Sequence, residues 1–340
     1  MHMADALLSP AVGGAMWLAS AAALAVAARQ LRTRADDRLV PLMGVLGAFV
    51  FAAQMVNFAI PGTGSSGHLG GGLMLAVLLG PHAALIVIAS VLTVQSLFFA
   101  DGGLLALGAN IFNLGVLPCC VAYPLVYRLL AGESVSPRRS GFAAVAAAVV
   151  GLQLGALGVV LETVASGISS LPLQAFLMVM LPIHLPIGLV EGFATAAILD
   201  FIRHAQPELL AVARRDRVPA RPAKRLLVAL SFAAGVTAAG LSALASSAPD
   251  GLEWAIEKTA GPDGVPMPQA GLADWLAGLQ QRTALLPDYQ LPGHAAPAES
   301  PPGPAGRPAQ VGTALAGLVG GAVTLLLVGG FVALLRRRRR

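Results

Sequence analysis

The chain consists mainly of long apolar stretches separated by short polar or basic loops. An α-helix needs roughly 20 consecutive apolar residues to cross the hydrocarbon core of a bilayer. Stretches of about that length occupy residues 10–28, 39–60, 82–100, 104–127, 141–165, 173–202, 226–247 and 311–335. A backbone surrounded by lipid must satisfy its own hydrogen bonds, so this pattern predicts an all-α, polytopic membrane protein.

One further apolar stretch, 69–80, is too short to cross a bilayer alone, because it reaches only about 18 Å before Pro81 ends it. Nineteen of the 22 Lys and Arg residues lie in four segments, which the positive-inside rule places in the cytoplasm: 29–38, 128–139, 203–225 and 336–340. These segments share one side only if 69–80 supplies a crossing or 69–100 contains a re-entrant turn. We therefore predict about seven crossings up to residue 203, one of them short or re-entrant, and two more beyond it. The amino terminus then lies outside and the carboxyl terminus in the cytoplasm.

The chain also divides by composition. Residues 1–203 form the predicted bundle, 204–225 a basic cytoplasmic linker, and 226–340 an accessory region. In that region two helices, 226–247 and 311–335, flank an outer segment and precede a basic tail. The outer segment, 248–310, is rich in Pro, Gly and Ala and carries seven acids against three bases.

Within the outer segment, residues 271–282 predict a short amphipathic helix, and residues 290–310 are typical of a disordered linker. Its acids could concentrate cations near the membrane, but a solvated linker is the favoured interpretation.

Composition excludes several classes of function. Only 11% of the residues are charged, against roughly 25% in soluble domains. The basic residues lie in short loops between apolar stretches, so they do not indicate nucleic-acid binding. The only lysines are Lys224 and Lys258, and neither follows a phosphate-binding glycine motif. Any ATP hydrolysis coupled to this chain must therefore occur on another subunit.

The strongest candidate for chemistry is a pair of histidines. His2 offers the terminal amine of Met1, its own backbone amide and its imidazole, and His68 lies in the glycine-rich stretch 62–72. Four nitrogens in or near a plane suit Ni(II) or Cu(II), and Co(II) less well. No basic stretch of the kind that opens a signal peptide precedes the first apolar segment, so we expect the amino terminus to be retained. Imidazoles must be neutral to bind a metal, so affinity should fall below about pH 6.5.

Polar side chains within apolar stretches either join helices or orient a ligating imidazole such as that of His68. The candidates for this role are Asn57, Gln95, Asn110 and Asn113. Ionisable side chains at membrane depth are costly and are usually functional. Those here are Glu162, His184, Glu191 and Asp200, the last of which is expected to pair with Arg203. His184 lies between Pro182 and Pro186 and is either a ligand during metal transit or, as we favour, a structural hydrogen-bonding group.

Short motifs along residues 1–203 occur in an order that resembles the substrate-capture components of nickel/cobalt energy-coupling-factor transporters, the CbiM/NikM family. They include Met1-His2-Met3-Ala4-Asp5, Ser65-Ser66-Gly67-His68-Leu69-Gly70-Gly71, Asp101-Gly102-Gly103, Gly108-Ala109-Asn110-Ile111-Phe112-Asn113 and His184-Leu185-Pro186-Ile187. Residues 226–335, with Pro249-Asp250-Gly251-Leu252-Glu253, resemble the accessory component that is often fused to such proteins.

The resemblance implies a multi-pass protein of the bacterial inner membrane, surrounded by lipid, that works with a transmembrane coupling protein and a pair of cytoplasmic ATPases. It implies metal ligands at Met1, His2 and His68, with Ni(II) as the expected cargo and Co(II) second, a link to cobalamin biosynthesis, and no permanent cofactor. It also implies that the chain is not itself an enzyme. Two alternatives stay open: a secondary metal transporter that works alone, and an intramembrane enzyme using Glu162, His184 or Glu191.

Overall fold

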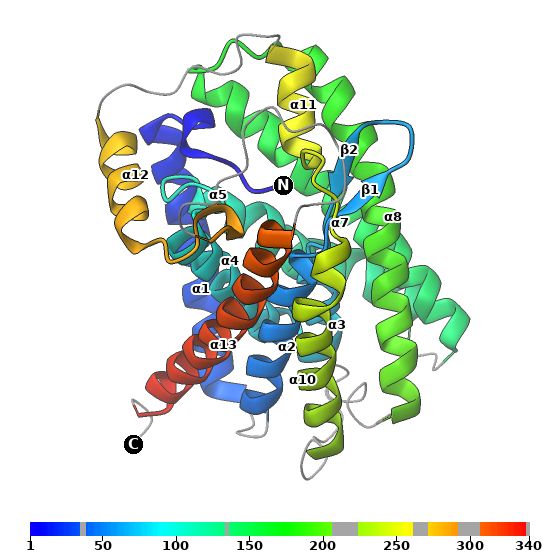
Figure 1. Ribbon diagram of the computed structural model, residues 1–340. Coiled ribbons are helices and arrows are strands. Elements are labelled where there is room, and N and C mark those ends of the chain that lie inside the picture. Colours follow the sequence, from blue (N-terminus) through cyan, green and yellow to red (C-terminus); the bar gives the residue numbers. More distant parts are fainter. Residues whose placement is uncertain (35–38, 133–135, 206–223, 261–270, 292–306, 338–340) are drawn as a thin grey trace.

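The computed structural model describes residues 1–34, 39–132, 136–205, 224–260, 271–291 and 307–337. Helices dominate this part of the chain, and the amino terminus lies inside one end of the bundle while the last helix ends at the other (Figure 1). Six of the described helices are long and apolar enough to cross a membrane. The predicted all-α, polytopic membrane fold is confirmed, with one small two-stranded hairpin added.

The predicted crossings up to residue 203 correspond to helices with shifted ends. They are α1 (Pro10–Arg34), α2 (Leu39–Gln54), α3 (Gly72–Leu79), α4 (Pro81–Phe99), a span built from α5 (Leu107–Ile111), η2 (Phe112–Tyr127) and α6 (Arg128–Ala131), then α7 (Pro137–Ser166) and α8 (Leu173–Ala205). The segment η2 is a wider π-helical stretch that contains Pro118 and Pro124. Because proline has no N–H to donate, it breaks the regular α-helical pattern of hydrogen bonds there.

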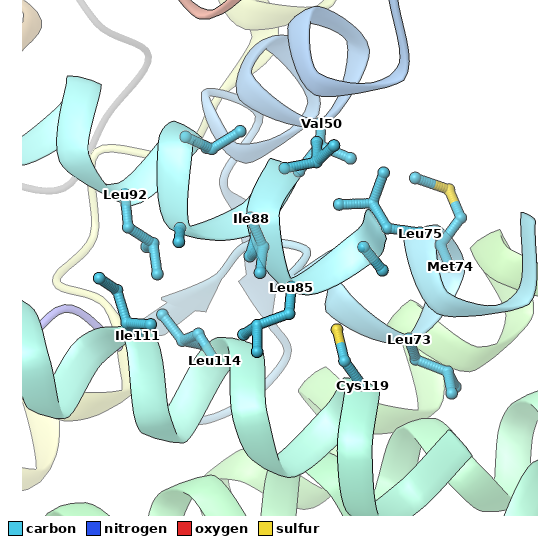
Figure 2. Packing of buried hydrophobic residues seen from close by; sticks show 14 of the residues in the cluster. Val50, Leu73, Met74, Leu75, Leu85, Ile88, Leu92, Ile111, Leu114 and Cys119 are labelled. Atoms are coloured by element: carbon cyan, nitrogen blue, oxygen red, sulfur yellow. The ribbon is translucent and has the colours of Figure 1, made fainter. Parts of the chain in front are cut away.

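The short helix α3 and the longer α4, which is long enough to cross a membrane, follow each other directly. The 8 residues of α3 span only about 12 Å. His68 before α3 and Asp101 after α4 both contact the first two residues of the chain, so the pair returns to the side from which it starts. Figure 2 shows how Leu73 and Leu85 pack toward η2, where Cys119 donates to the Gly72 carbonyl at 3.3 Å. Both alternatives for residues 69–100, a short crossing by 69–80 or a re-entrant turn, predict this return to the starting side.

The segment after α2 departs from the prediction. The apolar stretch 39–60 predicted one long helix, but α2 ends at Gln54 and the chain forms a hairpin of β1 (Phe58–Ile60) and β2 (Ser65–Gly67). The turn between the strands contains Gly62 and Gly64, which both adopt positive φ, a conformation that other residues rarely tolerate. The hairpin leads directly into His68.

The accessory region packs on the bundle and also reaches over one end of it. Helices α10 (Lys224–Ala239) and α13 (Arg307–Arg337) both pack against α2. Between them lie η3 (Leu241–Leu244), α11 (Gly251–Ala260), α12 (Leu272–Thr283) and η4 (Pro287–Tyr289), at the same end as the amino terminus (Figure 1). The amphipathic helix predicted at 271–282 is therefore present.

The linker interpretation of the outer segment needs a correction. Its described parts are ordered and packed, and α13 begins at Arg307, inside the stretch expected to be disordered. The reason is that polar groups of this segment bond to the bundle, as when Leu285 N–H donates to the Phe98 carbonyl at the end of α4 at 2.8 Å. Residues 292–306, and nearly all of the linker predicted at 204–225, lie outside the described residues.

Candidate metal centre

The first residues of the chain are fixed inside the bundle rather than left in solvent. The side chain of Asn110, on α5, binds both the N–H and the carbonyl of Met3. Its Oδ1 accepts from Met3 N–H at 2.8 Å, and its Nδ2 donates to the Met3 carbonyl at 3.2 Å. Gly103 N–H donates to the same carbonyl at 2.9 Å. These hydrogen bonds hold the backbone of Met3 as a neighbouring β-strand would. They therefore determine where Met1 and His2 lie.

A second set of bonds fixes the loop that carries His68. The carboxylate of Glu191, on α8, accepts from the N–H groups of Gly70 and Gly71 at 3.1 and 3.0 Å. The Gln54 amide donates to the Gly70 carbonyl at 2.8 Å. Gly71 has φ of +78°, which allows the backbone to present both N–H groups to one carboxylate. Glu191 was expected to be functional only as an ionisable group at membrane depth, and its observed contacts are those of a loop anchor.

The two anchored segments converge at the amino terminus. The Met1 amine lies 3.1 Å from His68 Nε2, and the imidazole rings of His2 and His68 are stacked, 5.1 Å apart and 9° from parallel. His68 Nδ1 lies 3.1 Å from the Leu69 carbonyl, which can only accept, so Nδ1 carries the proton. The lone pair of Nε2 therefore faces the Met1 amine.

The environment keeps His68 in the form that binds metals. Burial, together with the nearby amino-terminal ammonium, lowers the pKa of His68 to about 3. Its imidazole is consequently neutral at physiological pH, as a metal ligand must be. In the empty protein this neutral ring accepts a hydrogen bond from the ammonium that a metal ion would replace.

The accessory region contributes a carboxylate to the same place. Asp250 Oδ2 lies 2.5 Å from the Met1 amine. Its other oxygen caps α11, accepting from Leu252 and Glu253 N–H at 2.8 and 2.9 Å, while Glu253 accepts from Asp250 N–H at 3.0 Å. This reciprocal cap fixes the side chain. Burial alone would raise the pKa of Asp250, but the amino-terminal ammonium and His68 hold it well below its usual range.

A second carboxylate connects His2 to the accessory region. Asp101 Oδ1 lies 3.1 Å from His2 Nδ1, and its other oxygen accepts a short hydrogen bond from the Tyr289 hydroxyl. Although burial raises the pKa of Asp101, the interaction with His2 and the two hydrogen bonds lower it overall. His2 Nε2 is buried and has no hydrogen-bond partner among the described residues. The two halves of the candidate chelate, the amine and the His2 ring, are thus each held by one carboxylate.

A cavity of about 280 Å³ leads to this centre. Its walls come from both parts of the chain and include His2, His68, Asp101, Asp250, Glu253 and Asp288. Burial raises the pKa of Glu253 and of Asp288, and neighbouring acids add to the effect. A cavity lined by acids and ending at two imidazoles suits a divalent cation.

The other predicted polar residues occupy varied positions. Gln95 donates to Gln54 at 2.7 Å and so supports the His68 loop indirectly, and Asn57 lines the 280 Å³ cavity. Asn113 donates to Glu162 at 2.8 Å. Of the two roles left open for these amides, orientation of the His68 ring is not the one seen, because the Leu69 carbonyl lies against Nδ1. Asn110 fixes the Met3 backbone, while Gln95 and Asn113 join side chains of different helices.

The centre is not a cluster of ligating side chains. Within the described part of the chain, no three His, Cys, Asp or Glu side chains are grouped to hold a metal ion. One of the nitrogens that converge here is the terminal amine of Met1, which is not a side-chain group. The sequence reasoning also missed Asp250 and Tyr289 as neighbours of the centre, since they lie more than 180 residues from their partners.

Comparison with known proteins gives a consistent result. Residues 2–209 match the profile of CbiM, described as the cobalt uptake substrate-specific transmembrane region, and residues 224–337 match the PDGLE domain. A relative from Archaeoglobus fulgidus is 34% identical over 330 residues, 96% of each chain. The fused nickel transport protein NikMN of Rhodobacter capsulatus is 32% identical over 314 residues, 85% of this chain and 88% of its own. A crystal structure described as a transition metal transporter is 29% identical with a TM-score of 0.55, over 64% of this chain and 100% of that one.

Proposed function

The chain belongs to the CbiM family of cobalt uptake substrate-specific transmembrane regions, joined here to a PDGLE domain, and from that membership we propose that it captures Ni(II) for import. Co(II) is the second candidate. The observation that carries the proposal is the convergence of the Met1 amine and the neutral His68 Nε2 at 3.1 Å, beside the stacked ring of His2. The proposal requires that Met1 carry a free amine in the mature protein.

In the proposed site the ion is held by four nitrogens: the Met1 amine, the His2 amide, His2 Nδ1 and His68 Nε2. Three carbons separate the His2 amide nitrogen from Nδ1, so the ion closes a six-membered ring with Nδ1, and Nε2 lies too far for this. The Met1 amine and the His2 amide close a five-membered ring in the same way. Ni(II) favours such planar nitrogen sites and stands above Co(II) in the order of affinities, which is why nickel is placed first.

Loading then involves exchange of two contacts. The Met1 ammonium must leave Asp250 and lose its proton, and His2 Nδ1 must leave Asp101. The His2 amide must also release its proton to the solvent before its nitrogen can bind the ion. The positive charge of the ion replaces that of the Met1 ammonium, which contacts Asp250 and His68 in the metal-free protein. Both released carboxylates remain beside the ion, where they balance its charge.

The remaining parts of the proposal concern assembly. Residues 1–203 act as the capture unit and 226–340 as the accessory unit, with the linker between them in the cytoplasm. The centre faces outward, the carboxyl terminus lies in the cytoplasm, and the membrane is the bacterial inner membrane. A transmembrane coupling protein and two cytoplasmic ATPases supply the energy for release of the ion, so the chain itself hydrolyses nothing.

The test is accumulation of radioactive nickel by cells that carry this chain with or without the coupling protein and the ATPases. The proposal expects uptake only with all partners present, and no uptake when the ATPases lack their catalytic carboxylates. Competition with equimolar cobalt then ranks the two ions. Uptake by the chain alone would contradict ATP-driven import and support a secondary transporter.

A further inference from the structure

His184 is a predicted candidate that the proposed capture site does not use. It lies on α8 between Pro182 and Pro186 and is buried, with 1% of its surface exposed. Its Nδ1 is 2.7 Å from the Met180 carbonyl one helical turn earlier. The expected structural hydrogen bond is therefore present, but it occupies only one of the two ring nitrogens.

That bond determines the state of the other nitrogen. A carbonyl oxygen can only accept, so Nδ1 carries the proton and Nε2 of a neutral ring carries a lone pair. Nε2 is buried and has no hydrogen-bond partner within the described residues. Buried polar atoms without a partner are uncommon, and an unoccupied ligand position is one explanation for such an atom. His68 has the same tautomer, with Nδ1 on its own Leu69 carbonyl.

The free nitrogen lies against a small cavity beneath the amino terminus. The walls of the cavity include Met1, His68, His184, Asp250 and Gly251, together with apolar side chains. A side chain at Gly251 would place its first carbon 3.2 Å from His184 Nε2, so glycine leaves the approach to this nitrogen open. The space for a water-sized sphere is about 10 Å³, which is close to the volume that a single water or ion requires.

We propose that this cavity is a second, weaker position for the divalent transition-metal cargo, with His184 Nε2 as its nitrogen ligand and Asp250 as its carboxylate. The inference rests on the proposed function and extends it to the step after capture. Met1 and His68 line both positions, so the ion can pass from the four-nitrogen site to His184 without losing all of its protein ligands at once. A single imidazole and one carboxylate bind weakly enough to release the ion again.

The position can be measured on the full-length chain once the tighter site is disabled. One extra residue before Met1 removes the amine from the chelate, and the tag is placed at the carboxyl end. Equilibrium dialysis with Ni(II), and the visible spectrum of bound Co(II), then report the remaining ligands. We expect residual weak binding, and we expect His184→Asn in the extended chain to lower that affinity about tenfold and to change the Co(II) spectrum.

The choice of asparagine separates a ligand from a structural group. Its amide nitrogen can donate to the Met180 carbonyl as Nδ1 does, while the position of Nε2 is lost. His184→Ala removes both, so the proposal expects the two variants to be equally impaired in weak binding. If the extended chain with His184→Asn binds both ions as the extended chain does, the proposal is overturned.

The same variants in the unextended chain distinguish this inference from the function on which it rests. There His184→Asn should keep one tightly bound ion per chain and, in cells with all partners, slow nickel uptake about tenfold. If the unextended parent chain binds no ion, the proposed function itself fails. Tight binding in the parent with no effect of His184→Asn on weak binding overturns only the second position.

Discussion

The bundle and the accessory region meet at the amino terminus with opposite chemistry. Within the bundle, nitrogen ligands are fixed through backbone contacts, by Asn110 on Met3 and by Glu191 on the His68 loop. The accessory region instead brings Asp250 to the amine and Tyr289 to the Asp101 carboxylate. The bundle thus supplies the ligands, and the accessory region holds the Met1 amine in its metal-free, positively charged state.

The two regions also differ in how they are held. The bundle closes around α3 and α4 with a continuous apolar core (Figure 2). The outer part of the accessory region bonds to backbone carbonyls of the bundle: Trp254 donates to the Thr63 carbonyl at 3.0 Å, and Thr283 to the Leu97 carbonyl in the last turn of α4 at 2.7 Å. Three residues of this outer part are also buried in the same apolar core: Leu252, Ala255 and Leu286. The accessory side is therefore held to the bundle by apolar packing together with polar contacts to its backbone.

Removal of a bundle ligand should have the largest effect. His68→Ala takes away the neutral Nε2 beside the Met1 amine, so Ni(II) affinity should fall at least about 100-fold, the upper end of losses seen when ligand support is removed. Titration calorimetry on the purified chain measures this loss. The matched control is His204→Ala, at the exposed end of α8, which should bind as the parent does. Equal affinity of both variants would remove His68 from the site.

Release of the His68 loop should have the next largest effect. In Glu191→Gln, one of the two acceptor oxygens becomes an amide donor that faces a backbone N–H, so the loop loses its clamp. We expect Ni(II) affinity to fall by about 10- to 100-fold with the ligand set itself unchanged. X-ray absorption at saturating nickel checks the second part. A changed count of nitrogen ligands would mean that Glu191 acts in some other way.

A substitution in the accessory region should alter the rate of nickel association more than the affinity for nickel. Asp250→Asn keeps an N-cap for α11 but removes the charge beside the amine, so nickel association should slow about tenfold. Stopped-flow mixing at two ionic strengths measures the rate. Asp274→Asn, an equal charge change on exposed α12, is the control and should associate at the parental rate. A slower rate in both variants would assign the effect to net charge alone.

The pH dependence of the empty protein should show the smallest effect. The pKa of His68 in the folded protein is about 3, below its value in the unfolded chain, so unfolding takes up a proton as pH falls through about 6.5. This contribution to stability is therefore present at neutral pH and is lost in acid. Thermal unfolding in chelator should give a gap between the Tm of the parent and that of His68→Gln that widens from pH 4.5 to 7. A gap independent of pH would mean that His68 is not buried as a neutral ring.

The sequence predicted the bundle well because its signals are local. Apolar length and the placement of arginine determined the spans and required a short or re-entrant segment at 69–80. The end of α2 at Gln54 was missed, since residues 55–60 are apolar enough to continue the helix and only the Gly62–Gly64 turn favours a hairpin. Apolar length alone does not distinguish a buried strand from the end of a helix.

The candidate site was predicted only in its nitrogen half. His2 and His68 stand out by residue type and position, and the structure brings them together. Asp250 and Tyr289 carry no such signal, because an acid in a segment rich in Pro, Gly and Ala is typical of a solvated linker. Their roles depend on contacts across the whole length of the chain, which spacing along the sequence does not reveal.

The most direct test of the account is the metal content of the chain with and without one extra residue before Met1. Both versions carry a tag only at the carboxyl end, are purified from medium with equimolar nickel and cobalt, and are analysed by elemental mass spectrometry. The account predicts about one nickel per parent chain, with the extended version losing it almost entirely. Equal metal in both versions, or none in either, would contradict a site built on the amino terminus.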